Sequence, residues 1–383
     1  MKHRGGCRPD RRQQLLLKTL LTEPGNRESY WLEWESRVDL EQLDPGSLRL
    51  LPLLYQRLHE AGIPDSRILR YRGIYRHYWY RNRILIHRLA SALELLNQAD
   101  IVPLLLKGLP LALQTYADAA LRPMMDLDIL VPPEKLHETT SILAQNGWQT
   151  DRIQELVPDR TWLAAVKAIH LISPEGIAID LHGTMLSEIA DPGYDLRVLK
   201  DSHLVEIRQG KARVPRPTDL LFHTIVHGHR WNALPPFRWM VDVMELLNNQ
   251  GSDVAWDDIF RDAGTYNLSV RLRHALGELL HLLPESGQHG IPGSVSKCGD
   301  RAPLWEQAEH WLKTRNGLVA ARTGYVLFDT WRFIKKVPSG QRWSGLRRFF
   351  KLRWNVSRSR ELPAEMIRRV RKRMGRSRNT ASP

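Results

Sequence analysis

The pattern of apolar and polar positions changes twice along the chain, near residue 100 and again near residue 217. Up to residue 100 the apolar residues recur at helical spacing, and residues 66–100 form one long amphipathic segment with Ser66 as its expected N-cap. From residue 217 to about 284 the pattern is helical again, in segments expected to start near Thr218, Pro235, Ala255 and Ser269. The regions on both sides of the middle of the chain, up to residue 100 and 217–284, are therefore predicted to be helical.

The middle region alternates between short apolar runs and amphipathic segments. The stretch "IVPLLLKG" (101–108) predicts a strand, "LPLALQTYADA" (109–119) a helix, and "LRPMMDLDILVPP" (121–133) a second strand bounded by prolines. A helix is expected at 132–148, and "AIHLISPEGIAIDLHG" (168–183) is expected to fold as an antiparallel hairpin about its Pro-Glu-Gly turn. The order strand, helix, strand, helix, strand, strand predicts a small mixed sheet with helices against it.

The whole chain is therefore predicted to be an α+β protein, with a small mixed β-sheet core flanked by N-terminal and C-terminal helical regions. Its 383 residues are enough for two or three domains. We divide it into an N-terminal helical region (1–100), the core with the sheet (101–216), a helical domain (217–284), a turn-rich linker (285–303) and a C-terminal helical region with a basic tail (304–383).

Two aspartates interrupt the second predicted strand. Asp126 and Asp128 share one face with Leu130, about 7 Å apart along the strand, because side chains alternate between the two faces. Two such carboxylates repel each other and lose hydration when buried, and a hard divalent ion such as Mg²⁺ offsets that cost. The alternative is that Asp126 only begins the strand and Asp128 faces solvent at a sheet edge.

A third aspartate, Asp180, lies on the second arm of the predicted hairpin, with His182 two residues later. Asp126, Asp128 and Asp180 from two adjacent strands can hold two divalent ions about 3.5 to 4 Å apart, the arrangement that clamps attacking and leaving oxygens in nucleotidyl transfer. The sequence therefore favours a two-metal site at these three carboxylates.

Basic residues near the carboxylates are the expected phosphate contacts. Gly108 opens a predicted helix whose free N–H groups, with Lys107 beside them, can bind phosphate oxygens. Arg122 is expected as a bidentate phosphate contact. Two other interpretations stay open: Lys107 ends a strand in solvent, and Arg122 pairs with Asp118 or Asp126.

In this order, the elements resemble the nucleotidyltransferase superfamily, and more closely a bacterial branch with the pattern LKG…R…DxDxLV…xDLH. They are "LLLKG" (104–108), Arg122, "DLDILV" (126–131) and "IDLHG" (179–183), and the stretches "PTDLLFHTIVHGHRW" and "FRWMVDVMELL" extend the similarity to about residue 283. The wider superfamily usually has Gly-Ser closely before its paired aspartates, whereas here Lys-Gly lies 18 residues before Asp126.

The resemblance implies an enzyme that moves a nucleoside monophosphate from an NTP such as ATP to an acceptor, which is a small molecule, a sugar or a peptide. It implies two Mg²⁺ ions held by Asp126 and Asp128, with Asp180 as the third ligand and the base for the acceptor. Lys107, Gly108 and Arg122 are the implied nucleotide contacts.

Histidines need a separate interpretation. His182 is either a hydrogen-bonded structural residue or a substrate contact. His223 and His227 are four residues apart on a predicted helix and could bind a transition metal, but the preferred interpretation is that His227 and Trp231 face the substrate pocket or pack the helical domain. No histidine is followed by Asp and no Glu follows His223, which excludes a His-Asp phosphohydrolase and a metalloprotease helix.

The charge is concentrated at the C-terminal end. The net charge is +14, yet residues 332–383 hold 17 Lys and Arg against 2 acids, and the preceding residues hold 39 basic against 40 acidic residues. Cys7 and Cys298 are the only cysteines, which excludes a disulfide framework and fits a reducing compartment. No apolar run approaches the roughly 18 residues that span a bilayer, and the basic start reads as a helix, so we expect a cytoplasmic protein.

Two other functions stay open. One is a non-catalytic binding or scaffold protein on a nucleotidyltransferase fold, against which the three retained aspartates argue, since a buried trio without a metal is destabilising. The other is a tRNA or other nucleic-acid nucleotidyltransferase. The neutral body of the chain argues against it, because a polymer substrate is expected to require positive charge near the cleft.

The basic tail contains an amphipathic stretch, "WSGLRRFFKLRW" (343–354), whose apolar residues occupy an arc of about 140°. Such a helix can bind an anionic membrane surface, which would make the protein peripheral at the membrane. Alternatively, the aromatic face packs on the protein body, and only "RRVRKRMGRSR" (368–378) is solvated. The sequence does not decide between the two.

Overall fold

A computed structural model describes residues 6–150, 160–232, 236–283, 290–314, 318–335, 337–356 and 358–368. The described residues before 100 are mostly helical, as predicted, in α1 (Arg11–Leu21), α2 (Pro24–Glu35), α3 (Pro45–Leu48), α4 (Leu51–Glu60) and α5 (Asp65–Asn97). Helix α5 begins at Asp65 with Pro64 as its N-cap, so the prediction of Ser66 as the cap is wrong. Pro64 supplies the extended backbone that precedes the helix, and Ser66 lies inside the first turn.

A six-stranded mixed sheet forms the centre of the described chain, in the order β3-β4-β2-β1-β6-β5. The strands are β1 (Leu104–Leu106), β2 (Leu127–Leu130), β3 (Ile169–Ile172), β4 (Ala178–His182), β5 (His203–Ile207) and β6 (Gly210–Val214). The first four confirm the predicted strands and the hairpin, in which β3 and β4 pair antiparallel. The β5–β6 hairpin is an addition that the apolar pattern did not predict. Strand β5 is an edge strand whose side chains are mostly exposed, so it lacks the apolar alternation of a half-buried strand.

The two faces of the sheet contribute to different hydrophobic cores. Leu104, Leu106 and Leu130 belong to a core that also contains the N-terminal helices and the helices after residue 217. Leu105 and Ile129, from alternate positions, belong to a second core that includes α5. The alternation inferred for the strand at 127–130 is therefore confirmed, and Asp128 lies on the Leu130 face, toward the helices after residue 217.

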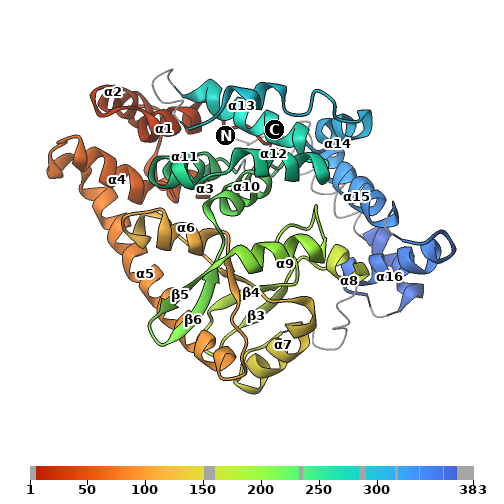
Figure 1. The fold of residues 1–383 in the computed structure, drawn as a ribbon. Helices are drawn as coiled ribbons and strands as arrows, with labels where there is room; N and C mark the ends of the chain where they lie inside the picture. The colour runs from red at the N-terminus through yellow and green to blue at the C-terminus, as the bar shows by residue number, and fades with distance from the viewer. Residues whose placement is uncertain are drawn as a thin grey trace.

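Four helices connect the strands and the helical layer follows them (Figure 1). The connecting helices are α6 (Gly108–Gln114), α7 (Leu136–Gln145), α8 (Arg160–Ala165) and α9 (Pro192–Asp201). The helical layer contains α10 (Pro217–Gly228), α11 (Arg238–Gln250), α12 (Trp256–Thr265) and α13 (Ser269–Leu282), which confirms the four predicted helical segments. Short 3-10 turns lie at Leu40–Gln42, Ala119–Leu121, Pro133–Lys135, Gly251–Asp253, Gly293–Lys297, Ser339–Gln341 and Ser359–Glu361.

The C-terminal helices α14 (Leu304–Thr314), α15 (Leu318–Lys335) and α16 (Arg342–Trp354) lie along one side of the molecule (Figure 1). Phe349 of α16 is 0% exposed and stacks on Phe333 at 4.8 Å between ring centroids, within the second core. Trp343, at the start of the same helix, is 83% exposed. This arrangement favours packing of the aromatic face on the body, and most of the basic segment 368–378 lies outside the described residues. No helix among the described residues has the length and apolar character needed to cross a membrane.

Candidate active site

The pairing of the central strands brings the predicted carboxylates together. Strand β2 runs parallel to β4, with Asp128 opposite Asp180 and Leu130 opposite His182. On its other side β2 is antiparallel to β1, so Asp128 lies opposite Leu106, the residue before Lys107. Three strands therefore deliver Lys107, Asp128, Asp180 and His182 to one face of the sheet.

Asp128 is the most connected residue of this group. Its side chain is almost completely buried, at 4% exposure, and its Oδ1 accepts hydrogen bonds from Lys107 Nζ and from His182 Nε2, the latter at 2.9 Å. Asp180 is half-buried, and its Oδ1 lies 2.9 Å from His170 Nδ1 across the β3–β4 hairpin. The edge alternative, in which Asp128 faces solvent, is wrong because β2 is an interior strand.

Ligand atoms of Asp128, Asp180 and His182 lie within 4.8 Å of one another, the one such group among the described residues that could hold a metal ion. Asp126 is not part of this group. It precedes β2, is exposed, and lines the adjoining pocket. His182 was predicted only as a structural residue or substrate contact. Its position two residues after Asp180 on the same strand face is a signal from which the sequence could have placed it beside the carboxylates.

The electrostatics differ between the two aspartates of the 126–128 pair. Desolvation in the pocket, and then the negative charge of Asp128, raise the pKa of Asp126, with a smaller contribution from Asp180. Burial also favours the neutral form of Asp128, but hydrogen bonds and positive charge from His182 and Lys107 outweigh it and lower the pKa of Asp128. Asp128 is therefore a stable carboxylate, and Asp126 lies beside negative charge that a cation would relieve.

Lys107 and Gly108 form the junction between β1 and α6. Lys107 has φ 55° and ψ −114°, a strained backbone conformation for a residue with a side chain, and its ammonium group pairs with Asp128. Gly108 permits a close approach, since a Cβ atom there would lie 3.0 Å from Nη1 of Arg122. Lys107 therefore belongs to the site, which excludes the solvated strand end considered from the sequence.

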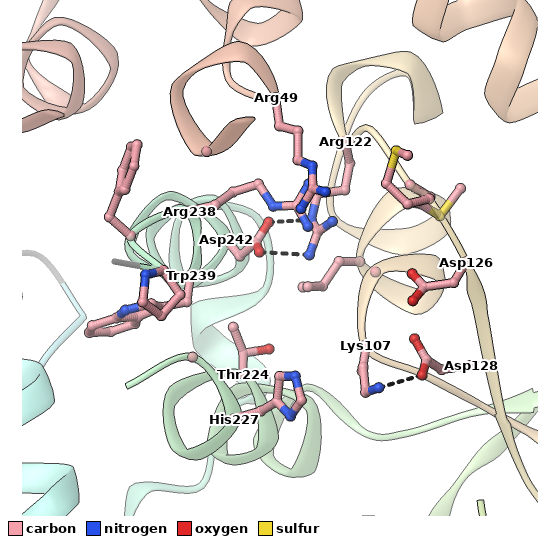
Figure 2. A pocket seen from close by; sticks show the side chains of 18 of the residues that line it. Arg49, Lys107, Arg122, Asp126, Asp128, Thr224, His227, Arg238, Trp239 and Asp242 are labelled. Carbon is pink, nitrogen blue, oxygen red and sulfur yellow. Dashed lines mark hydrogen bonds and ion pairs between the residues drawn. The ribbon is translucent and has the colours of Figure 1, made fainter. Parts of the chain in front are cut away.

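A pocket of about 460 Å³ adjoins the carboxylates, within the usual volume of small-molecule sites. Lys107, Asp126 and Asp128 line it from the sheet, and Figure 2 shows the ion pair of Lys107 with Asp128 beside Asp126. The remaining lining includes residues of α10 and α11 and of the segments that follow α3, the turn Ala119–Leu121 and α10, among them Arg49, Arg122, His223, Thr224, His227, Arg230, Arg238, Trp239 and Asp242. Five basic side chains and three carboxylates line the pocket, so it suits an anionic substrate that also needs a cation.

Arg122 lines this pocket but pairs with a residue that the sequence did not suggest. Its Nε and Nη2 donate to the two carboxylate oxygens of Asp242 on α11, at 2.6 and 2.9 Å, and the hydroxyl of Tyr116 donates to Asp242 Oδ1 at 2.8 Å. The side chains of Arg122 and Asp242 are only 7% and 3% exposed. The alternatives of Asp118 and Asp126 as partners of Arg122 are therefore wrong.

Two histidines of α10, His223 and His227, line the pocket and stack on each other. The rings of His223 and His227 are 5.4 Å apart and nearly parallel, and both residues line the cavity. Burial, and next the positive charge of Lys107, lower the pKa of His223 to about 3. The two histidines are not part of a metal-ligand group among the described residues. Trp231 is buried against Cys7 and does not line this pocket.

Comparison with known proteins adds one finding. The model of a family described as uncharacterised nucleotidyltransferases matches residues 47–284, which include the whole sheet and the helical layer. No curated protein matches the chain.

Proposed function

The chain belongs to the uncharacterised nucleotidyltransferase family, and we propose that it transfers a nucleoside monophosphate from an NTP to an acceptor in a Mg²⁺-dependent reaction. The observation that carries the proposal is the pairing of Asp128 with Asp180 on adjacent strands, beside a 460 Å³ pocket that Asp126 also lines. Nucleotidyl transfer requires carboxylates that hold metal ions and basic side chains that contact the phosphate oxygens.

The donor set fits a magnesium site. Asp128 and Asp180, with Asp126 at the adjoining pocket, would supply the carboxylate oxygens that Mg²⁺ prefers. Burial, and next the negative charge of Asp128, raise the pKa of Asp126, and a divalent ion would offset that negative charge. His182 already donates to Asp128 Oδ1, so we assign it the role of orienting that carboxylate. When bound, Mg²⁺ would supply positive charge for the attacking and leaving oxygens.

The protein's own residues have distinct roles in the proposed reaction. A nucleophilic atom of the acceptor forms a bond to the α-phosphorus of the NTP, the bond from that phosphorus to the α–β bridging oxygen breaks, and pyrophosphate leaves with the electron pair. Asp180, held by His170, takes the proton of the acceptor. Lys107 provides positive charge for the phosphate oxygens, next to Gly108.

Label transfer tests the proposal directly. The purified protein is incubated with cell extract, Mg²⁺ and each of the four NTPs labelled at the α-phosphate, and labelled products are separated. We expect one NTP to label an acceptor in the presence of Mg²⁺, and Asp126→Asn and Asp128→Asn to abolish the labelling. Asp257→Asn, at an exposed position on α12, is the matched control and should keep the activity.

Circular dichroism of each variant shows whether the fold is retained. Labelling by Asp128→Asn at the wild-type rate would remove Asp128 from the mechanism. Failure of all four NTPs would favour a non-catalytic binding protein on this fold.

A further inference from the structure

Three guanidinium groups gather on a wall of the pocket away from Lys107 and Asp128. Figure 2 shows Arg49, Arg122 and Arg238 pointing toward one another around the carboxylate of Asp242. They come from distant parts of the chain: Arg49 follows α3, Arg122 precedes β2, and Arg238 begins α11. The helical layer and the N-terminal region thus build a cationic wall that faces the same cavity as the carboxylates.

The single carboxylate of this wall, Asp242, already has hydrogen-bond partners on both oxygens. Both oxygens of Asp242 bind Arg122, and one of them also accepts the hydroxyl of Tyr116. Among the described residues, neither Arg49 nor Arg238 forms an ion pair, and Nη1 of Arg238 donates to the carbonyl oxygen of Pro123 at 2.7 Å. Two guanidinium groups therefore lack an ion pair of their own among the described residues, although the charge of Asp242 also acts on Arg238.

The surroundings of Arg238 make this charge costly. Burial, and next the positive charge of Arg122, lower the pKa of Arg238 to about 9, and Arg49 acts in the same direction. At neutral pH the guanidinium is still charged, so an anion bound between these groups would remove a repulsion that exists in the free protein.

The N-terminus of α11 faces the same cavity. This helix of thirteen residues has no side-chain cap, and its first turn lines the pocket. The positive end of its dipole and the two guanidinium groups together match the charge and the oxygens of a phosphate group.

We infer that Arg49, Arg238 and the first turn of α11 form a phosphate-binding wall that is separate from the carboxylate site. The inference rests on the proposed function for its meaning: the phosphate group belongs either to the terminal phosphates of the NTP or to a phosphorylated acceptor. Binding of phosphate itself does not depend on turnover.

Calorimetric titration of the full chain with inorganic phosphate, in EDTA, tests the wall. We expect Arg49→Gln and Arg238→Gln each to weaken phosphate binding by roughly tenfold or more, since a hydrogen bond to a charged group is lost. Arg76→Gln, at an exposed position on α5, removes the same charge elsewhere and should bind as the wild type does. Equal affinity of all three variants and the wild type would overturn the inference.

The side chain of Arg49 makes no hydrogen bond or ion pair among the described residues, so Arg49→Gln decides the question even where Arg238→Gln disturbs the fold. Asp126→Asn separates this inference from the proposed function, because it should abolish transfer and keep phosphate binding. If the wild-type protein transfers no label from any NTP but binds phosphate through Arg49 and Arg238, the proposed function is wrong and the phosphate-binding wall stands.

Competition identifies the source of the phosphate group. With Mg²⁺ present, displacement of bound phosphate by the productive NTP would assign the wall to the terminal phosphates of that nucleotide. Simultaneous binding of both would assign the wall to the acceptor, which would then be a phosphorylated molecule.

Discussion

Replacement of Asp242 by Asn tests the buried ion pair that joins the sheet to the helical layer. The pair is bidentate, with N–O distances of 2.6 and 2.9 Å, and both side chains are at least nine-tenths buried. The substitution keeps the shape of the side chain but leaves the charge of Arg122 unpaired next to Arg238. Breaking one partner of a buried pair costs about 3–5 kcal/mol, because the remaining charge cannot regain its hydration.

Urea unfolding, followed by tryptophan fluorescence, measures this cost. We expect the free energy of unfolding of Asp242→Asn to fall by about 3–5 kcal/mol. The matched control is Glu33→Gln, whose partner Arg37 is 43% exposed, and a change under about 1 kcal/mol is expected there. Added phosphate should restore part of the stability of Asp242→Asn, since three guanidinium groups then lack a carboxylate. A loss below about 1 kcal/mol for Asp242→Asn would refute this account of the pair.

Three further predictions concern burial and packing. Burial lowers the pKa of His223 to about 3, so below about pH 6.5 the unfolded chain takes up a proton that the folded chain does not, and stability should fall by up to about 1.4 kcal/mol per pH unit. His223→Phe should reduce this dependence of stability on pH, measured by urea unfolding at pH 7 and pH 5. An unchanged dependence would count against the low pKa of His223. Gly228→Ala would place a Cβ atom 2.3 Å from Trp239 Cβ and should cost about 1–3 kcal/mol, whereas Gly277→Ala, with open space around it in α13, should be neutral or stabilising in the same assay. Phe349→Ala should lower stability by about 3–5 kcal/mol, and Trp343→Ala should leave it unchanged, so equal thermal shifts would contradict docking of α16.

Local pattern was sufficient for the elements that carry the site. Alternation placed Asp128 on the Leu130 face, and the Pro-Glu-Gly turn placed Asp180 on a hairpin arm, both as the structure has them. The same rule of alternation places His182 beside Asp180, but a histidine fits many structural roles, so its type alone gave no reason to choose.

The local sequence pattern does not predict which remote segments of the chain contact one another. The sequence predicted Asp128 and Asp180 on adjacent strands, but the register that sets Asp128 opposite Asp180 depends on the whole sheet. Arg122 pairs with Asp242, 120 residues later, where a nearer Asp118 and Asp126 were equally suitable in sequence. The sequence did not predict the cationic wall for the same reason, since Arg49 and Arg238 come together only when the N-terminal region packs on the helical layer. Domain boundaries drawn from the sequence stay a prediction.

The docking of α16 has a consequence for the order of events during synthesis. Phe349 and Leu352 complete the core on one face of the sheet, yet β6, the last strand of the described residues, ends at Val214, roughly 140 residues earlier. At usual rates of translation the ribosome needs on the order of ten seconds to add those residues. During that interval the sheet of the nascent chain has apolar surface that α16 has yet to cover, so this face of the core is complete only when the C-terminal helices have been synthesised.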